Sequence, residues 1–344
     1  MTLADVALAV LWLAVVAYLL FGGADFGAGT WDLLAGRGER GRPVRELIEH
    51  IIGPVWEANH VWLIFAIVMA WTAFPLAFAS AAATLIIPLT LVAVGIIFRG
   101  SAFVFRKSVP AGRLEELFGV LFAASSVLTP FFLGAVAGAL ASGHVPYGTV
   151  GDVVGSWLTP ASLFSGVMAV LVCAYLAAVY LTGDARRTGE HALAEYFRTR
   201  ALVSGIVTGV VAVTGLVVIA RYAGGLFIGL VGVALPFAVA SAAAGAASLV
   251  LLALRRYGAV RLTAAAAVAL VLVAWAAAQY PHLLQANVTV QQAAATDAVL
   301  GAVLVSLAVG AVLLVPSLVW LYSMFQRESR RQGADVGTGP SADA

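Results

Sequence analysis

Long apolar runs, separated by short polar segments, make up most of this chain. Nine of them can be recognised, at 3–24, 53–73, 76–98, 117–140, 160–181, 201–220, 226–254, 262–279 and 298–323. Their length, roughly 18 residues or more with few charges, suits a helix that crosses the hydrocarbon core of a membrane. Backbone amides in lipid need internal partners, and the runs lack the alternation of barrel strands. The pattern therefore predicts an all-α polytopic membrane bundle of nine transmembrane helices.

The composition supports this interpretation. Of the 344 residues, 62% are hydrophobic and 10% are charged, against about 25% charged residues in a soluble domain. We expect one transmembrane domain over 1–325 and a polar, disordered tail over 326–344. A signal peptide over 1–21 is disfavoured, because the start lacks basic residues and carries Asp5. The single cysteine, Cys173, lies in an apolar run and is predicted to be a buried, inert thiol.

Basic residues gather in alternate connections of the predicted bundle. Eighteen of the 19 Lys and Arg residues fall on one side, in 37–45, 99–113, 186–200, 255–261 and 327–331, and only Arg221 falls on the other. Cytoplasmic connections are the ones enriched in Lys and Arg, so we predict an external N-terminus and a cytoplasmic C-terminus. This alternation needs an odd number of helices, in keeping with nine. The net charge of +2 reflects the same asymmetry, and no nucleic-acid partner is predicted.

Polar residues occur where hydrocarbon is expected, at the ends of the first three runs. The first run ends near Asp25, the second begins close to Glu57 and His60, and the third ends at Arg99. Pro54 suits the first position of the second helix, and Glu57 and His60 are three residues apart, on one face of that helix. The structural interpretation is that Glu57 favours a helix N-terminus and that the other groups lie among lipid headgroups. The functional interpretation is that the four groups converge at the inner leaflet and carry protons.

Only one histidine, His60, lies inside a predicted span, where it is a candidate haem ligand. A low-spin haem needs two axial ligands at one depth, and Met69 lies about 13 Å further along the same helix. One five-coordinate haem on His60 stays open, whereas several haems in this chain are disfavoured. The glycines of 23–29 follow a membrane helix rather than a strand, so no nucleotide site is predicted, and no metal motif is present.

Three stretches resemble subunit II of cytochrome bd-type quinol oxidases. They are GGADFGAGTWDLL at 22–34, IIGPVWEANHVWLIFAIVMAWTAFPLAFA at 51–79 and IIFRGSAFVFR at 96–106. The order of these motifs, their spacing and the nine-helix layout match that family over most of the chain, and LTPASLFSG at 158–166 is a weaker match.

The resemblance implies a heterodimer in a bacterial cell membrane. Its haem-bearing subunit I would carry two b-type haems and a d-type haem, bind quinol, and couple quinol oxidation to reduction of oxygen to water. Subunit II would hold no haem, and this chain is expected to contain no catalytic residue and no metal site. A structural quinone and membrane lipid are further expected ligands.

The resemblance also implies a proton path from the cytoplasm to which subunit II contributes. The family's helix-two acid belongs to that path and matches Glu57, and its helix-one aspartate lies near the path and matches Asp25. We expect the path residues to be Glu57, His60 and Asp25, with Asn59, Arg99 and Trp56 in supporting positions.

Some positions depart from the family pattern. Gly22 stands where the family has an acid, Glu57 replaces an aspartate, His60 replaces an acid, and Gly100 follows Arg99 where proline is common. Two alternatives remain at this point: a proton-coupled secondary transporter that uses the same carboxylates, and a purely structural membrane subunit. The absence of an obvious internal repeat counts against the transporter.

Overall fold

A computed structural model describes residues 1–36, 38–52, 56–110, 112–284 and 288–336. Regular structure in these ranges is helical, apart from one isolated antiparallel bridge between His282 and Thr289. The chain divides into two compact units, Met1–Ala294 and Ala295–Ala344, and each is described by itself. The helices are α1 (Leu3–Leu34), α2 (Arg42–Ile52), α3 (Trp56–Ala73), α4 (Pro75–Thr84), α5 (Ile86–Ser108), α6 (Arg113–Ala141), α7 (Pro160–Arg187), α8 (His191–Tyr222), α9 (Gly224–Val231), α10 (Leu235–Ala253), α11 (Tyr257–Gln279), α12 (Val290–Ala293) and α13 (Asp297–Val336).

Seven helices within the described ranges are long and apolar enough to cross a membrane, namely α1, α5, α6, α7, α8, α10 and α11. The pair α2 and α3, bent by 56°, makes an eighth if it is counted as one broken span. The ninth predicted run falls on α13, where a shorter apolar stretch, Asp297–Leu313, is described. The all-helical, polytopic membrane architecture is therefore confirmed with seven to eight spans, and the ninth span and the orientation of the termini stay predictions.

Two of the predicted runs are each divided into two helices. The run 76–98 breaks at Leu85, between α4 and α5, and the run 226–254 breaks between α9 and α10. Pro88 and Pro236 lie in the first turns of α5 and α10. Proline is tolerated there because the first backbone N–H groups of a helix have no intrahelical acceptor. These prolines therefore begin helices after a break rather than bend a continuous one.

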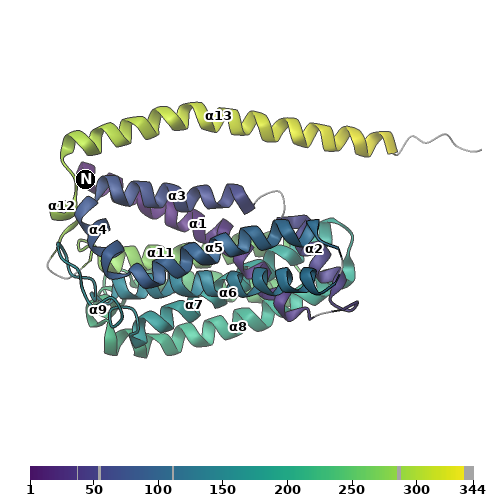
Figure 1. Cartoon of the computed structure of the whole chain (residues 1–344), viewed down its shortest axis with the longest axis horizontal. Helices are drawn as coiled ribbons and strands as arrows, with labels where there is room; N and C mark the ends of the chain where they lie inside the picture. Colours follow the sequence, from purple (N-terminus) through teal and green to yellow (C-terminus); the bar gives the residue numbers. More distant parts are fainter. Residues whose placement is uncertain (37, 53–55, 111, 285–287, 337–344) are drawn as a thin grey trace, which may run out of the picture. The chain divides into compact units, whose positions relative to one another are not determined.

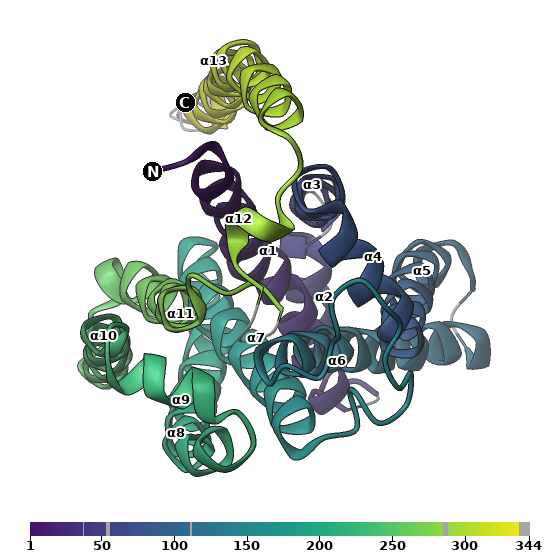
Figure 2. The same cartoon turned by 90° about the vertical axis from the view of Figure 1, so that its left-hand side faces the viewer.

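Helix α7 lies at the centre of the first unit, in contact with α1, α6, α8 and α11 (Figure 2). The long helices of this unit run side by side (Figure 1). Small residues permit the close contacts: a Cβ on Gly27 of α1 would lie 1.8 Å from the carbonyl oxygen of Cys173 on α7. Gly134 of α6 is similarly close to Ser165 of α7. Glycine is required at such crossings because two backbones touch, as is common between membrane helices.

Helix α2 is short and amphipathic. Val44, Leu47 and Ile48 are buried and join the apolar core around α7. Arg42 on its outer side pairs with Glu46. Because one face of α2 is held by the core, the helix brings its remaining acid, Glu49, up to the C-terminal part of α5.

The second unit consists mainly of α13. This helix begins with Asp297 in its first turn, contains Pro316, and continues past Phe325 to Val336. Residues 337–344 lie outside the described ranges, so the predicted disorder of the tail stays a prediction.

Candidate functional site

A buried polar group joins α1, α3, α5 and α6. Asn59 donates from Nδ2 to Oδ2 of Asp25 at 2.6 Å. Arg99 donates from Nη2 to the backbone carbonyl oxygen of Asp25 at 3.1 Å and from Nε to Oγ of Ser126 at 3.1 Å. Asp25 is 5% exposed and Arg99 only 1%. We call Asp25, Asn59, Arg99 and Ser126 the buried polar site.

Arg99 is the largest fully buried side chain described in this chain. Its guanidinium carbon lies 4.9 Å from the ring centroid of Phe26 and 5.2 Å from that of Phe122, so two aromatic faces flank the cation. An isolated buried charge is costly, and such charges occur where they are paired and hydrogen-bonded. The hydrogen bonds to Asp25 and Ser126 and the two rings provide that compensation.

Glycines in α1 make room for this arrangement. A Cβ on Gly29 would lie 2.2 Å from Cβ of Ser126, so only glycine lets α6 approach near enough for Ser126 to meet Arg99. A Cβ on Gly22 would lie 2.9 Å from the ring of Tyr18. The position at which the family pattern has an acid is therefore filled here by the Tyr18 ring.

His60 is the residue after Asn59 on α3 and lies beside the buried polar site. Its Nδ1 is 3.0 Å from the carbonyl oxygen of Trp56, and its Nε2 is buried with no hydrogen-bond partner among the described residues. The hydroxyl of Tyr18 is likewise buried and unpaired among them, and the two ring centroids are 6.1 Å apart. It is unusual to find two such unpaired atoms, His60 Nε2 and the Tyr18 hydroxyl, near each other, because buried polar groups normally have hydrogen-bond partners.

Three aromatic rings lie near the imidazole of His60. The ring centroids of Tyr18, Phe26 and Trp56 lie 6.1, 5.9 and 6.0 Å from that of the imidazole. The five-coordinate haem on His60 that the sequence left open stays an alternative.

Glu57 lies apart from the buried polar site. It is exposed and makes no hydrogen bond or ion pair with any described residue. It belongs to an exposed stripe along α3 that continues through Val61, Ile64, Val68 and Trp71, which are 60, 60, 49 and 64% exposed. Of the four groups predicted to converge, Asp25 and Arg99 meet, His60 lies adjacent and Glu57 stays apart. Asn59, predicted in a supporting position, contacts Asp25. Pro54, predicted to begin this helix, lies outside the described residues.

A second ionic group, which the sequence reasoning missed, lies near the last turn of α1. Arg106 of α5 donates from Nη1 to both carboxylate oxygens of Asp32, at 3.2 and 3.3 Å, and its Nε is 3.2 Å from Oε1 of Glu49. The Asp32 and Arg106 side chains are 5 and 9% exposed, whereas Glu49 is 28% exposed. Asp32 follows Asp25 by seven residues, about 10.5 Å along one face of α1. The seven-residue spacing of the two aspartates was the signal in the sequence that could have pointed to Asp32.

An apolar cavity of about 290 Å³ lies among α1, α3, α4, α6 and α11. Its lining includes Leu8, Trp12, Phe74, Ala77, Leu140 and Trp275. Gln279, a polar residue of the lining, already accepts from Trp275 Nε1 at 2.8 Å and donates to the backbone carbonyl of Leu283. The cavity therefore suits an apolar chain, and the structural quinone expected from the sequence stays a prediction.

The fold and these buried groups define a polytopic helical membrane protein with ionisable residues inside its spans. A family model described as cytochrome bd terminal oxidase subunit II matches residues 3–325. The chain therefore belongs to the cytochrome bd terminal oxidase subunit II family.

Individual relatives agree with this assignment. The chain is 29% identical over 180 residues to the cytochrome bd ubiquinol oxidase subunit 2 of Bacillus subtilis (strain 168), covering 50% of this chain and 52% of that protein. It is 28% identical over 213 residues to the cytochrome bd-I ubiquinol oxidase subunit 2 of Escherichia coli (strain K12), covering 58% of this chain and 53% of that protein. The chain thus spans about half the length of these curated relatives.

The fold also matches a solved structure. The superposition on a chain of the bd oxidase from Geobacillus thermodenitrificans has a TM-score of 0.73 with 24% identity and covers 94% of this chain and 99% of that chain. At this identity, the match shows a shared fold.

Proposed function

We propose that this chain is the non-haem subunit of a bd-type terminal oxidase in a bacterial cell membrane. In this proposal the complex couples quinol oxidation to reduction of oxygen to water, and the chain packs against the haem-bearing subunit I. Family membership supports the class of complex. The observation that carries a proton role is the Asn59–Asp25 hydrogen bond beside the fully buried Arg99. Ionisable groups at membrane depth usually mark ion or proton routes.

The proposed route starts at the end of α1 that carries the second ionic group. Glu49 is partly exposed, and Arg106 links it to the buried Asp32. Asp25 lies two helical turns deeper along α1, and His60 and Tyr18 follow with their unpaired polar atoms. Water can connect polar groups that are too far apart for direct contact, provided that the site offers it several partners. The cytoplasmic origin of the protons rests on the charge asymmetry of the connections.

Glu57 has a different proposed role, at the contact with subunit I. A carboxylate on an otherwise apolar membrane-facing stripe is expensive unless a polar partner covers it. The stripe of Glu57, Val61, Ile64 and Trp71 has the spacing of one helix face, which supports packing against another helix. We expect subunit I to cover this face, so that Glu57 passes protons across the contact.

Asp25→Asn tests the proton role directly. The amide keeps a hydrogen-bond acceptor for Asn59 but cannot exchange a proton at neutral pH. In the complex with subunit I, oxygen consumption should fall by a factor of about 100, the low end for loss of an acid–base group. The haem spectrum should stay normal. Asp152→Asn, in an exposed loop, is the matched control and should retain wild-type turnover.

Glu57→Gln should also slow oxygen consumption at normal haem content, and Glu46→Gln on the exposed side of α2 is its control. If both Asp25→Asn and Glu57→Gln turned over like the wild type, the chain would be a structural subunit only. A haem-free chain that purifies without subunit I and moves a solute would instead support the transporter.

A further inference from the structure

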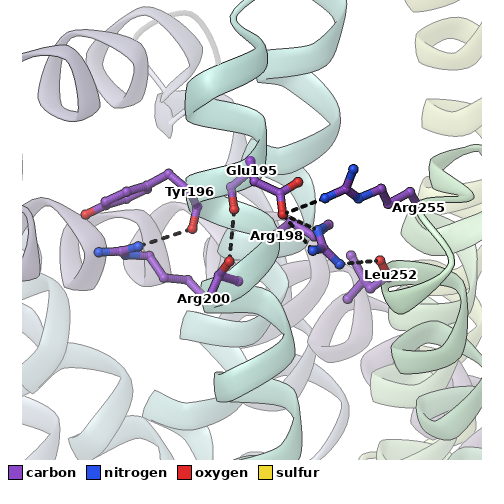
Figure 3. Close-up of polar contacts among 7 residues, drawn as sticks. Glu195, Tyr196, Arg198, Arg200, Leu252 and Arg255 are labelled. Atoms are coloured by element: carbon purple, nitrogen blue, oxygen red, sulfur yellow. Dashed lines mark hydrogen bonds and ion pairs between the residues drawn. The ribbon is translucent and has the colours of Figure 1, made fainter.

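Two arginines, one on α8 and one in the turn between α10 and α11, meet around one carboxylate at the start of α8 (Figure 3). Arg198 donates from Nε and Nη2 to Oε1 of Glu195 at 2.9 and 2.6 Å. Arg255, from the turn between α10 and α11, donates from Nη2 to the same oxygen at 3.3 Å. Arg198 also donates to the carbonyl oxygen of Leu252 on α10 at 3.2 Å. These contacts tie the start of α8 to the end of α10.

A second carboxylate at the same end of the bundle is shared in the same way. Oδ1 of Asp184, near the end of α7, accepts from Arg187 and, at 3.3 Å, from Nη1 of Arg261 on α11. Arg186 stacks over the ring of Tyr257, with 4.5 Å between the guanidinium carbon and the ring centroid. Tyr257 begins α11 just after Arg255, so the two carboxylate groups belong to one surface. We call this surface the arginine cluster; it comprises Arg186, Arg187, Arg198, Arg255 and Arg261 with Asp184 and Glu195.

The arginine cluster is not neutral. Four guanidinium groups contact its two carboxylates, and a fifth, that of Arg186, lies over the Tyr257 ring, so the cluster carries three more positive than negative charges. Arg187, Arg255 and Arg261 keep 66, 64 and 45% of their side-chain surface exposed, so their remaining N–H donors are accessible. Guanidinium groups suit phosphate because their planar donors match its oxygens in pairs. The excess positive charge therefore favours binding of an anion at the arginine cluster.

The backbone at Arg255 adds an independent indication. Its φ is +56°, in the left-handed region that favours glycine. The N–H groups of Arg255 and Arg256 bond the carbonyl oxygens of Leu252 and Leu251, as in the motif that ends many helices with glycine. An arginine at this position costs backbone energy that a glycine would not. The turn alone would favour glycine at position 255, so we attribute the arginine there to a role of its side chain.

The surface beside the arginine cluster is apolar. Val250, Leu254 and Leu262, on α10, in the turn and on α11, are 56, 62 and 73% exposed. Leu254 directly precedes Arg255, and Leu262 directly follows Arg261. A ligand that carried both a phosphate and hydrocarbon chains would meet arginine and apolar surface together. A free phosphate would contact only the arginines.

We propose that the arginine cluster binds the phosphate of an anionic phospholipid, whose acyl chains lie along Val250, Leu254 and Leu262. Basic surfaces between membrane helices are suited to such headgroups. The lipid would hold the α7–α8 pair and the α10–α11 pair together at this end. This inference does not depend on the oxidase proposal, because it rests on contacts within this chain alone.

The test is a lipid titration of the full-length chain, purified with its partner subunit and followed by native mass spectrometry. Phosphatidylglycerol should bind several-fold more tightly than phosphatidylcholine. Arg255→Gly should weaken phosphatidylglycerol binding about fivefold, since one basic residue near a membrane surface contributes roughly a factor of that size. The thermal stability of lipid-free Arg255→Gly should equal or exceed that of the wild type, because glycine relieves the positive φ.

Arg221→Gly, at the opposite end of α8, is the control and should leave lipid binding unchanged. Arg261→Gln should weaken phosphatidylglycerol binding similarly, and it decides the matter if Arg255→Gly fails to fold. Equal binding of both lipids, or wild-type binding by these two variants, would overturn the proposal. So would inorganic phosphate that competes at the affinity of the lipid, since that result would indicate a site for free anions.

Discussion

The buried polar site and the arginine cluster use arginine in opposite ways. Arg99 is 1% exposed, flanked by two aromatic rings and hydrogen-bonded to a backbone carbonyl and a serine. Arg255 is mostly exposed and shares a carboxylate with a second arginine. A charge inside a span must have its partners built into the protein, whereas a charge at the end of a span can take partners from headgroups and water. The same side chain therefore points to a proton route in one place and to the membrane surface in the other.

The largest expected effect is at Arg99. Arg99→Met should leave the buried Asp25 carboxylate without a neighbouring cation, and Ser126 and the Asp25 carbonyl without their donor. We expect a loss of about 3–5 kcal/mol, as when one of two opposite buried charges is removed. Thermal unfolding in detergent measures it. The double variant Arg99→Met with Asp25→Asn should recover much of the loss, because no charge is then stranded. Arg221→Met should hardly change the stability. An equally large loss of stability in that variant would contradict the idea that burial makes Arg99 important.

The next effect concerns the backbone contact that supports the buried polar site. Gly27→Ala should destabilise the protein by about 3 kcal/mol, the upper range for overpacking, because its Cβ would lie 1.8 Å from a carbonyl oxygen of α7. Gly209→Ala makes the same change where no atom lies within 4 Å and should be neutral or slightly stabilising. Thermal unfolding of both variants checks this, and a Gly27→Ala variant as stable as Gly209→Ala would show that the helix crossing is looser than described.

A smaller loss is expected for the second ionic group, which is intermediate in exposure. Arg106→Gln should reduce stability by about 2 kcal/mol, within the range for hydrogen bonds to charged groups, because Asp32 would lose its cation while Glu49 could turn to water. Thermal unfolding measures the loss, and Arg42→Gln, in an exposed pair with Glu46, should cost much less. If both variants lost equally little stability, the Arg106–Asp32 pair would contribute no more than an exposed surface ion pair.

The smallest effect is expected at an exposed loop. Backbone N–H groups of Gly155 and Val154 lower the pKa of Asp152 below its ordinary value of 3.8. The stabilisation is therefore present above pH 3.8 and disappears as the pH falls through the lowered pKa. Asp152→Asn should lower the melting temperature slightly at neutral pH, and the difference from the wild type should vanish in acid. A difference that persisted there would indicate a contact that does not depend on charge.

The candidate site was predicted in part. Asp25, Asn59 and Arg99 meet as expected, because alternating helix directions bring their positions to one depth, although α1 and α5 each continue nine residues beyond Asp25 and Arg99. Glu57 departs from that expectation, since a shared depth does not decide which face of a helix a residue occupies. Three further residues were missed: Tyr18 lies among apolar residues, Asp32 looks like an ordinary acid near a helix end, and Ser126 looks like an ordinary serine in the middle of a span.

Hydropathy alone determined the class of protein and the positions of most helices, because lipid forces backbone hydrogen bonds inside each segment and leaves a continuous apolar run in the sequence. It did not determine the breaks at Leu85 and after Val231, which add no charge and hardly change local hydropathy. Only the tertiary structure decided which helix faces meet. Packing between membrane helices depends on shape at single positions such as Gly27 and Gly29, where a missing side chain brings two backbones together.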